Sequence, residues 1–214
     1  MNQLKSLLRL CQKNHVSFLY VAIRAAYWKL FRGLLLFAPA AVAMRIKGRI
    51  ETSDRLVVGL GESNFTDGRE RTILNIRGKL ALAGAYSIGS GCRFDIGNDA
   101  TVKIGKGGYI NVNTTVVIMH GLTIGDQCVI SWNCQFLDED FHQVEYEGKT
   151  QRPKEITLGS HVWVGCGSSI YSGTSIPDGC IVASNSVVRG VFSEPNCIIG
   201  GNPAKIIKRN VDWK

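Results

Sequence analysis

The residues best suited to catalysis are a histidine and a cluster of carboxylates within the segment 137–142. This segment contains Asp138, Glu139, Asp140 and His142. An imidazole with an ordinary pKa of about 6.5 can take a proton from an attacking hydroxyl group near neutral pH. A neighbouring carboxylate can fix the tautomer of the ring and stabilise the imidazolium that forms. We therefore predict His142 as a general base, with Asp138 and Asp140 either orienting it or binding an acceptor hydroxyl.

Three other histidines were weighed against this assignment. His120 follows a hydrophobic run at an expected turn and is the alternative base. His15 lies in a basic segment and is expected at the surface, whereas His161 is expected at a turn. Because His120, His142 and His161 are 22 and 19 residues apart, no close pair of ligands is present, and no metal site is expected.

A period of six residues surrounds these candidates and indicates the fold. Its hydrophobic positions are Ile124, Ile130 and Phe136, then Leu158, Val164, Ile170, Ile176, Val182 and Val188. Earlier runs, offset by two residues, are Ile88 and Phe94, then Ile104, Ile110 and Val116. Six matches neither an amphipathic helix nor an alternating strand, but it matches short parallel strands joined by turns around a three-sided prism. Eighteen residues would form one coil.

The period is interrupted once at length, between Phe136 and Leu158. The intervening loop, about 137–157, is polar and charged and includes His142. A long loop that leaves a rigid repeat is where functional residues are expected.

The cysteines fit the repeat without any chemical role. Four of the seven occupy the fifth position of a hexad, where a free thiol acts as a small hydrophobic group: Cys92, Cys128, Cys134 and Cys180. No CxxC spacing occurs, so neither a disulfide framework nor a zinc ribbon is indicated. Reduced thiols in a cytoplasmic protein are expected.

The sequence resembles the hexapeptide-repeat acyltransferases, which fold as a left-handed parallel β-helix. The matching segments are the coil around Trp163 at 158–165, the later hexads at 176–179 and 182–188, and the closing motif at 201–208. They occur in the family's order and at its usual spacing, and the likeness covers about residues 88–208. The resemblance implies a mainly β protein with an N-terminal helical segment and a short C-terminal tail.

The resemblance also implies a donor and an assembly. The donor would be acetyl-CoA, bound in a groove between two β-helices of a homotrimer. By motif, Cys166, Ser184, Arg189 and Lys208 match positions that line the pantetheine arm and the phosphates. The family's catalytic histidine lies on the loop before the Trp coil, which again selects His142.

Three departures from the family pattern limit what can be transferred. Cys166 and Ser184 replace other small residues at two donor turns, and Arg189-Gly190 replaces a Thr-Lys pair. Gln143 replaces a proline that commonly follows the loop histidine. The same resemblance implies that a backbone N–H of the turn at 165–166 stabilises the oxyanion of the acyl-transfer intermediate.

Charge divides the chain into two parts. The formal net charge is +8, and the first fifty residues hold nine bases and no acid, since Glu51 is the first carboxylate. The remaining 164 residues hold 16 bases and 17 acids. No basic stripe or motif on the folded part supports nucleic-acid binding. The excess charge therefore belongs to the N-terminal segment.

The N-terminal segment has helical, apolar character and two open interpretations. Its longest uncharged run, 33–44, is too short for a bilayer span of about 20 residues, and a cleaved signal peptide is disfavoured because the leader would be overlong. As an interfacial segment, it would place Trp28, Phe31 and Phe37 at a headgroup boundary and Arg24, Lys29 and Arg32 on anionic lipid: a peripheral membrane contact. Alternatively, it is a helical cap packed on the main domain or on another subunit.

The sequence thus predicts a helical segment at 1–50, a β-helix at 51–193 with an extruded loop, and a closing segment at 194–214. The expected function is acetyl-CoA-dependent O-acetylation of a saccharide hydroxyl in surface polysaccharide or lipid-linked glycan synthesis. It would take place in the cytoplasm, and a peripheral contact would hold the enzyme at the inner face of the cytoplasmic membrane if the leader is interfacial. The alternatives are N-acetylation of an amino sugar, or a non-catalytic β-helix scaffold whose leader binds a membrane or a partner.

Overall fold

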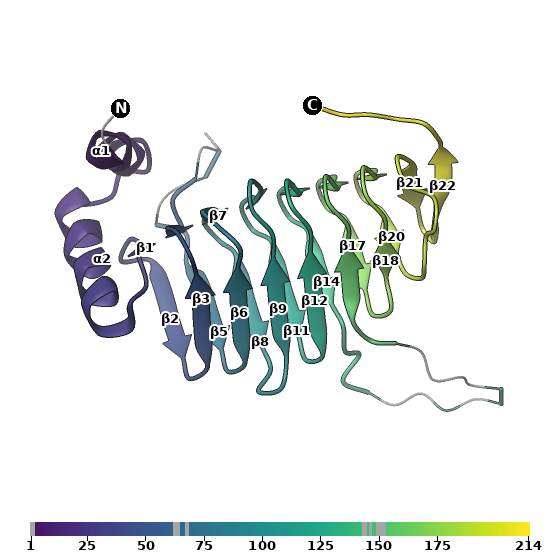
Figure 1. Cartoon of the computed structure of the whole chain (residues 1–214), viewed down its shortest axis with the longest axis horizontal. Coiled ribbons are helices and arrows are strands. Elements are labelled where there is room, and N and C mark those ends of the chain that lie inside the picture. The colour runs from purple at the N-terminus through teal and green to yellow at the C-terminus, as the bar shows by residue number, and fades with distance from the viewer. Residues whose placement is uncertain (1–2, 62–64, 67–68, 143–144, 146, 149–152) are drawn as a thin grey trace.

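The computed structural model describes residues 3–61, 65–66, 69–142, 145, 147–148 and 153–214. The described chain starts with two helices and continues as a parallel β-helix with three faces (Figure 1). The helices are α1 (Gln3–Lys13) and α2 (Phe18–Arg32). The three-sided prism of parallel strands predicted from the hexads is confirmed, as is the β-helix fold that the family resemblance implies.

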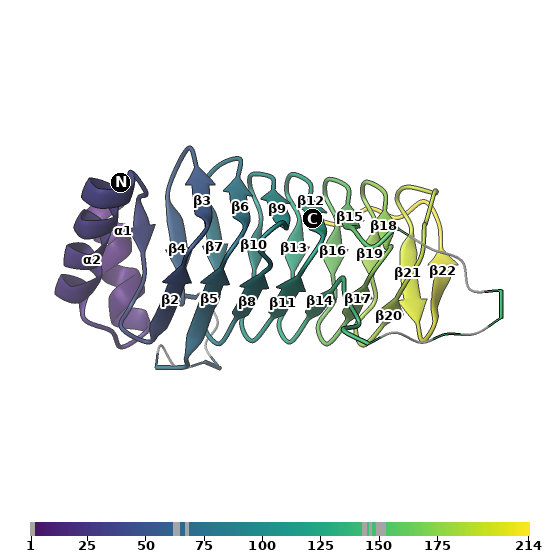
Figure 2. The ribbon, with the colours of Figure 1, turned by 90° about the horizontal axis from the view of Figure 1, so that it is seen from below.

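Each face of the prism is one sheet, and the chain visits the three sheets in turn. Sheet A contains β1 (Leu36–Phe37), β4 (Leu56–Val58), β7 (Tyr86–Ile88), β10 (Tyr109–Ile110), β13 (Val129–Ile130), β16 (Trp163–Val164), β19 (Ile181–Val182), β21 (Ile198–Gly201) and β22 (Ala204–Lys208). Sheet B contains β2 (Val42–Ile46), β5 (Thr72–Ile76), β8 (Arg93–Ile96), β11 (Thr115–Ile118), β14 (Gln135–Leu137), β17 (Ser169–Tyr171) and β20 (Val187–Val188). Sheet C contains β3 (Arg49–Thr52), β6 (Lys79–Leu82), β9 (Thr101–Ile104), β12 (Gly121–Ile124), β15 (Ile156–Leu158) and β18 (Ser175–Ile176). Figure 2 shows the strands stacked along the long axis.

The predicted hydrophobic positions form ladders inside the prism. Along sheet B, Val116 pairs with Phe136, which pairs with Ile170, and all three are buried. An eighteen-residue coil holds in the later part, where Leu158 pairs with Ile176. Earlier coils are longer: residue 104 pairs with 124 and residue 88 with 110, because the extra residues are absorbed at the turns.

Turns between the sheets need small residues or residues that tolerate a left-handed backbone conformation. Asn113, Asn133 and Asn185 all have φ near +58°, a conformation that asparagine tolerates better than most residues. Gly125 stands where a Cβ would lie 2.5 Å from the backbone of Gly159 in the next coil. The repeated Gly of the hexads is therefore required by the close stacking of turns.

The fifth-position cysteines are packing residues, as predicted. Cys92, Cys128, Cys134 and Cys180 are buried and free. Burial raises the pKa of Cys128 and Cys134 to about 11 and that of Cys92 to about 12. These thiols stay protonated near neutral pH and are poor nucleophiles.

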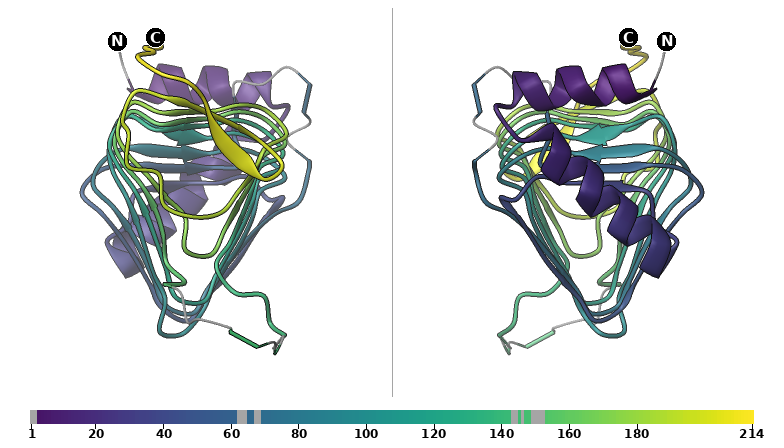
Figure 3. Two further views of the ribbon diagram at one scale, coloured as in Figure 1. Left: turned by 90° about the vertical axis from the view of Figure 1, so that its right-hand side faces the viewer. Right: turned by 90° about the vertical axis from the view of Figure 1, so that its left-hand side faces the viewer.

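Helix α2 closes the N-terminal end of the prism. Ser17 caps it by accepting the Tyr20 N–H at 3.3 Å, and Gly33 ends it with φ of 66°. The Arg24 guanidinium donates to the carbonyls of Pro39 and Val42, which fixes α2 to the first coil. Figure 3 shows α2 lying across the end of the prism.

The change from helix to strand comes earlier than the residue-50 boundary predicted for the leader. Strands β1 to β3 already pair with later coils, and Leu34, Leu36 and Val42 belong to the core. The run at 33–44 is apolar because it starts the β-helix. None of the described helices combines the length and the apolar character that crossing a bilayer requires.

Candidate active site at one edge of the prism

The long loop leaves the prism where sheet B turns into sheet C, an edge we call the B–C edge. It connects β14 to β15, and the described residues that follow β14 leave the stack of coils at this edge (Figures 1 and 3). Ile124 still pairs with Leu158 on its far side, so the coil continues as if the loop were absent. The prediction that the hexads break here for an extruded loop matches these strand bounds.

Asp138 holds the adjacent turn of the previous coil. Its carboxylate is fully buried and accepts the backbone N–H groups of Met119 at 2.7 Å and of His120 and Gly121 at 2.8 Å. Strand alternation explains its direction, because Asp138 follows Phe136 by two residues and points to the same inner side. Predicted as a partner of His142, Asp138 instead has both oxygens engaged by backbone.

Glu139 links the loop to His120 and Lys154. Its Oε2 accepts from His120 Nε2 at 2.8 Å and forms an ion pair with Lys154 Nζ, while Oε1 accepts the Asp140 N–H at 3.0 Å. Lys154, followed by His120, lowers the pKa of Glu139 to about 2. Glu139 was not singled out from the sequence. Its contact with His120 joins turns of neighbouring coils, which hexad counting does not align.

His142 is the predicted base, and it extends beyond this anchored part of the loop. It is exposed and makes no hydrogen bond or ion pair with any residue the structure describes. The preceding residue, Phe141, has φ of 60°, an uncommon conformation for an aromatic residue. Gln143, which departs from the family pattern, lies outside the described residues. The base assignment of His142 stays a prediction.

Asp140, the other carboxylate predicted beside His142, faces Arg189. Its Oδ1 lies 3.4 Å from Arg189 Nη2, and both side chains are about half exposed. The Arg189 guanidinium also lies 5.5 Å from the centre of the Tyr171 ring. Arg189 was predicted to contact the donor, so this contact brings one predicted catalytic and one predicted donor-binding residue together at the B–C edge.

The other predicted donor residues lie elsewhere. Cys166 and Ser184 follow β16 and β19 at the edge between sheets A and B, and Cys166 Sγ donates to Ser184 Oγ at 3.4 Å. Lys208 is exposed at the end of β22. A single chain thus distributes the predicted residues over two edges of the prism and its C-terminal end.

The turn at 165–166 offers one backbone donor. Gly165 N–H is taken by Val182 O at 2.8 Å, whereas Cys166 N–H has no acceptor among the described residues. Gly165 is also the residue at which a Cβ would meet Ser184 N at 2.7 Å, so the backbone passes very close to the next coil. If this turn supplies an oxyanion donor, the Cys166 N–H is the available one.

His161 is a turn residue, as predicted, with φ of 56°. Its ring stacks on Trp213 with centroids 4.1 Å apart, and Trp213 Nε1 donates to the His161 carbonyl. Trp163 lies 6.0 Å from Trp213 and donates through Nε1 to Ser131 Oγ. The C-terminal tail therefore folds back over the Trp coil.

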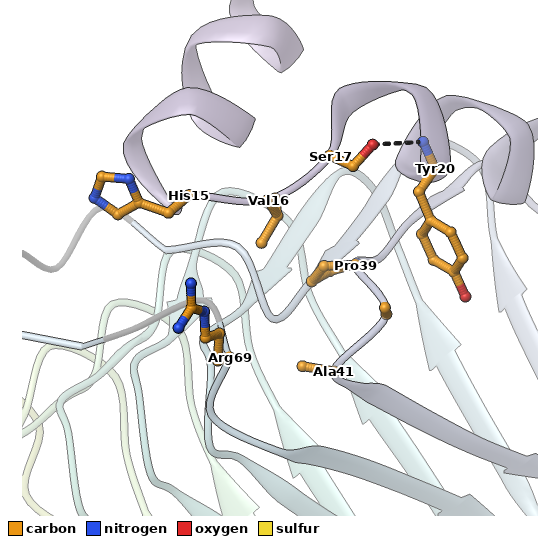
Figure 4. A pocket seen from close by; sticks show the side chains of 8 residues that line it. His15, Val16, Ser17, Tyr20, Pro39, Ala41 and Arg69 are labelled. Atoms are coloured by element: carbon orange, nitrogen blue, oxygen red, sulfur yellow. Dashed lines mark hydrogen bonds between the residues drawn. The ribbon is translucent and has the colours of Figure 1, made fainter.

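A cavity of about 270 Å³ lies at the N-terminal end, away from the loop (Figure 4). It is lined by His15, Val16, Ser17, Tyr20, Pro39, Ala40, Ala41 and Arg69. His15 has φ of 54° at the turn between α1 and α2 and is exposed, as predicted. Within the described part of the chain, no three potential metal-ligating side chains cluster.

Comparison with known proteins gives relatives but no match to a protein-family model. An uncharacterized 24.8 kDa protein in the cps region of Klebsiella pneumoniae is 34% identical over 206 residues, which is 95% of this chain and 92% of that protein. Galactoside O-acetyltransferase of Escherichia coli is 30% identical over 112 residues, or 51% of this chain and 54% of the relative. The chain belongs to the hexapeptide-repeat acyltransferases.

This membership confirms the resemblance inferred from the Trp coil and the closing motif, and with it an enzyme that transfers acyl groups. Among solved structures, the polysialic acid O-acetyltransferase OatWY overlays with a TM-score of 0.41 and 22% identity, covering 84% of this chain and 86% of that chain. In this hexapeptide-repeat acyltransferase, the loop at the B–C edge is the candidate active site.

Proposed function

We propose that the protein transfers the acetyl group of acetyl-CoA to a hydroxyl group of a saccharide, with His142 as general base. The observation that supports this proposal is the arrangement of the loop. Asp138 and Glu139 hold the start of the loop by contacts to the neighbouring coil. His142 lies beyond them and is exposed, without a partner in the described chain. A base must be accessible to both substrates, and His142 meets this requirement better than His120, whose Nε2 already contacts Glu139.

In the proposed reaction, His142 takes the proton of the attacking hydroxyl group as its oxygen bonds to the thioester carbonyl carbon. The Cys166 N–H donates to the oxyanion that forms on that carbonyl. When the carbon–sulfur bond breaks, the imidazolium of His142 returns the proton to the departing thiolate. The products are an acetyl ester and free CoA thiol, and His142 ends the cycle neutral.

Acetyl-CoA as donor fits the residues present. The small side chains of Cys166 and Ser184 leave room beside the backbone along one edge. Arg189 and Lys208 are exposed cations that suit phosphate groups. Buried free thiols are consistent with a reducing cytoplasm, where acetyl-CoA would be supplied.

A homotrimer would bring the separated groups together. His142 and Arg189 lie on one edge of the prism and Cys166 and Ser184 on another. If copies pack side by side with parallel axes, the loop of one copy can reach the donor edge of its neighbour. Each groove would then use His142 from one chain and Cys166 from the next.

The relatives support a saccharide acceptor. Their names include a galactoside O-acetyltransferase, a polysialic acid O-acetyltransferase and a protein in the cps region. A surface polysaccharide or a lipid-linked glycan is the acceptor class we propose. Transfer to a sugar amine would use the same base and give an amide.

The test is an acetyl-transfer assay with the purified full chain, acetyl-CoA and a panel of neutral, acidic and amino saccharides. We expect saccharide-dependent release of CoA thiol and a product whose acetyl group is removed by mild alkali, as for an ester. An alkali-stable product would show N-acetylation. Failure to bind acetyl-CoA, or to release thiol with any saccharide, would favour a non-catalytic scaffold. Sedimentation of the same sample tests the trimer.

A further inference from the structure

Helix α2 has two apolar faces, and only one of them is used by the fold. Val21 and Ala25 are buried, and Val21 packs in the small core with Leu7 and Cys11 of α1. The opposite face carries large apolar side chains that are all more than half exposed: Leu19, Ile23, Tyr27, Leu30 and Phe31. Their spacing places them on one side of the helix, and Tyr27 and Phe31 contact each other with ring centroids 4.9 Å apart. We call these five residues the outer face of α2.

The outer face differs from the interfacial set expected from the sequence. Trp28 packs against the main core and Phe37 against the small core under α1, while Arg24 is held by two carbonyls of the first coil. These three residues therefore belong to the cap. The cap interpretation of the leader therefore describes the inner side of α2, and the outer face takes no part in it.

The direction of the outer face limits what can cover it. Helix α2 lies across the end of the prism, so its outer face points away from the coils along the long axis (Figures 1 and 3). Copies packed side by side with parallel axes would repeat this face at one end of the assembly and leave it uncovered. A flat surface beyond that end would contact all copies at once.

Charge at this end favours an anionic surface. Lys29 is exposed at the side of the outer face, and Lys5 and Arg9 are exposed on α1. The first carboxylate of the chain, Glu51, is ion-paired with Lys79 at 2.8 Å and with Arg49. Apolar and aromatic side chains flanked by Lys and Arg are typical of helices that lie in the headgroup region of a bilayer.

We propose that the outer face of α2 binds an anionic lipid surface, with the helix in the plane of the membrane and the prism standing on it. Leu19, Ile23 and Leu30 would enter the acyl boundary, and Lys29 would meet lipid phosphates. Where the active-site loop lies relative to a lipid-linked acceptor rests on the proposed function, but the docking itself does not.

The test is cosedimentation of the full-length protein with vesicles of phosphatidylcholine alone or of equal parts phosphatidylcholine and phosphatidylglycerol. Binding is expected only to the anionic vesicles and is expected to weaken with salt. The double variant Ile23→Ser/Leu30→Ser should lower partitioning by at least about tenfold. Lys29→Glu should lower it by about tenfold.

Matched controls come from the β-helix. Val191→Ser removes an apolar side chain that is 77% exposed, as Leu30 is, and Lys103→Glu reverses an exposed charge on sheet C. Both controls should bind vesicles as the wild type does. Absence of binding to anionic vesicles, or equal loss in the controls, would overturn the proposal.

Two further readouts separate this proposal from others. If the α2 variants change the oligomeric state in sedimentation, the outer face is a contact between copies and the lipid proposal is wrong. Thiol release with acetyl-CoA and a soluble saccharide should be unchanged in these variants. Since that activity is measured without lipid, loss of vesicle binding and failure of the proposed chemistry are distinguishable.

Discussion

His120 and His142 belong to the same edge of the prism, but the chain fixes only one of them. His120 lies in a turn whose N–H groups bind Asp138, and its ring contacts Glu139. His142 lies on the loop after Glu139 and has no contact of this kind with the described residues. Carboxylates next to a histidine in sequence therefore need not orient it. Here they anchor the loop, and none of the residues that the structure describes orients His142.

The largest expected effect comes from replacing each of the two histidines with alanine. His142→Ala should lower kcat by about a thousandfold, because a positioned general base contributes on that order. His120→Ala should lower it only a few-fold through loosening of the loop. Turnover by thiol release and acetyl-CoA affinity by calorimetry measure both, with affinity unchanged for each variant. A greater loss of kcat in His120→Ala would assign the base to His120.

The two aspartates extend this comparison to stability, because Asp138 is buried and bonded to the backbone whereas Asp140 is exposed. Asp138→Ala should lower the free energy of unfolding by about 3 kcal/mol, since three backbone N–H groups lose a charged acceptor. Asp140→Ala removes an exposed, long ion pair with Arg189 and should change it by less than about 0.5 kcal/mol. Urea unfolding at one fixed protein concentration compares them, because assembly would shift apparent stability. Equal losses would contradict the structural role of Asp138.

The smallest expected effect is the loosening of the start of the loop, residues 139–141, at acid pH. Lys154 and His120 depress the pKa of Glu139 from 4.5 to about 2, so its contribution is present above pH 4.5 and is lost as the pH falls towards 2. Hydrogen exchange of the Asp140 and Phe141 amides, corrected for intrinsic rates, should accelerate across this window. Glu139→Gln should abolish the pH dependence of this exchange. If the dependence persists in that variant, another group controls the start of the loop.

The ladders of the β-helix were predictable because the period is a direct result of packing. Positions such as Phe136 and Ile170 must alternate with turns to fill a prism of constant width. The start of the coil near Leu36 was not predictable in the same way, since the early coils are longer and break the count of six. An apolar run of twelve residues can be strand or helix, and periodicity alone does not decide.

Within the candidate site, the loop and its histidine followed from the interrupted period, but the carboxylate contacts did not. Glu139 meets His120 across neighbouring coils, and that alignment depends on the length of the turn between β11 and β12. In α2, apolar residues surround the helix, so the sequence alone did not indicate that Trp28 turns inward while Leu30 turns outward.

The uninterrupted register on both sides of the loop has an evolutionary consequence. Residues 122–124 pair with 156–158 although more than thirty residues of chain separate them. Beyond Asp138 and Glu139, which contact the neighbouring coil, the core constrains only where the insertion leaves and returns. Under the proposed function, substitutions in the rest of this one segment would change the acceptor preference while the scaffold and the donor edge are inherited unchanged.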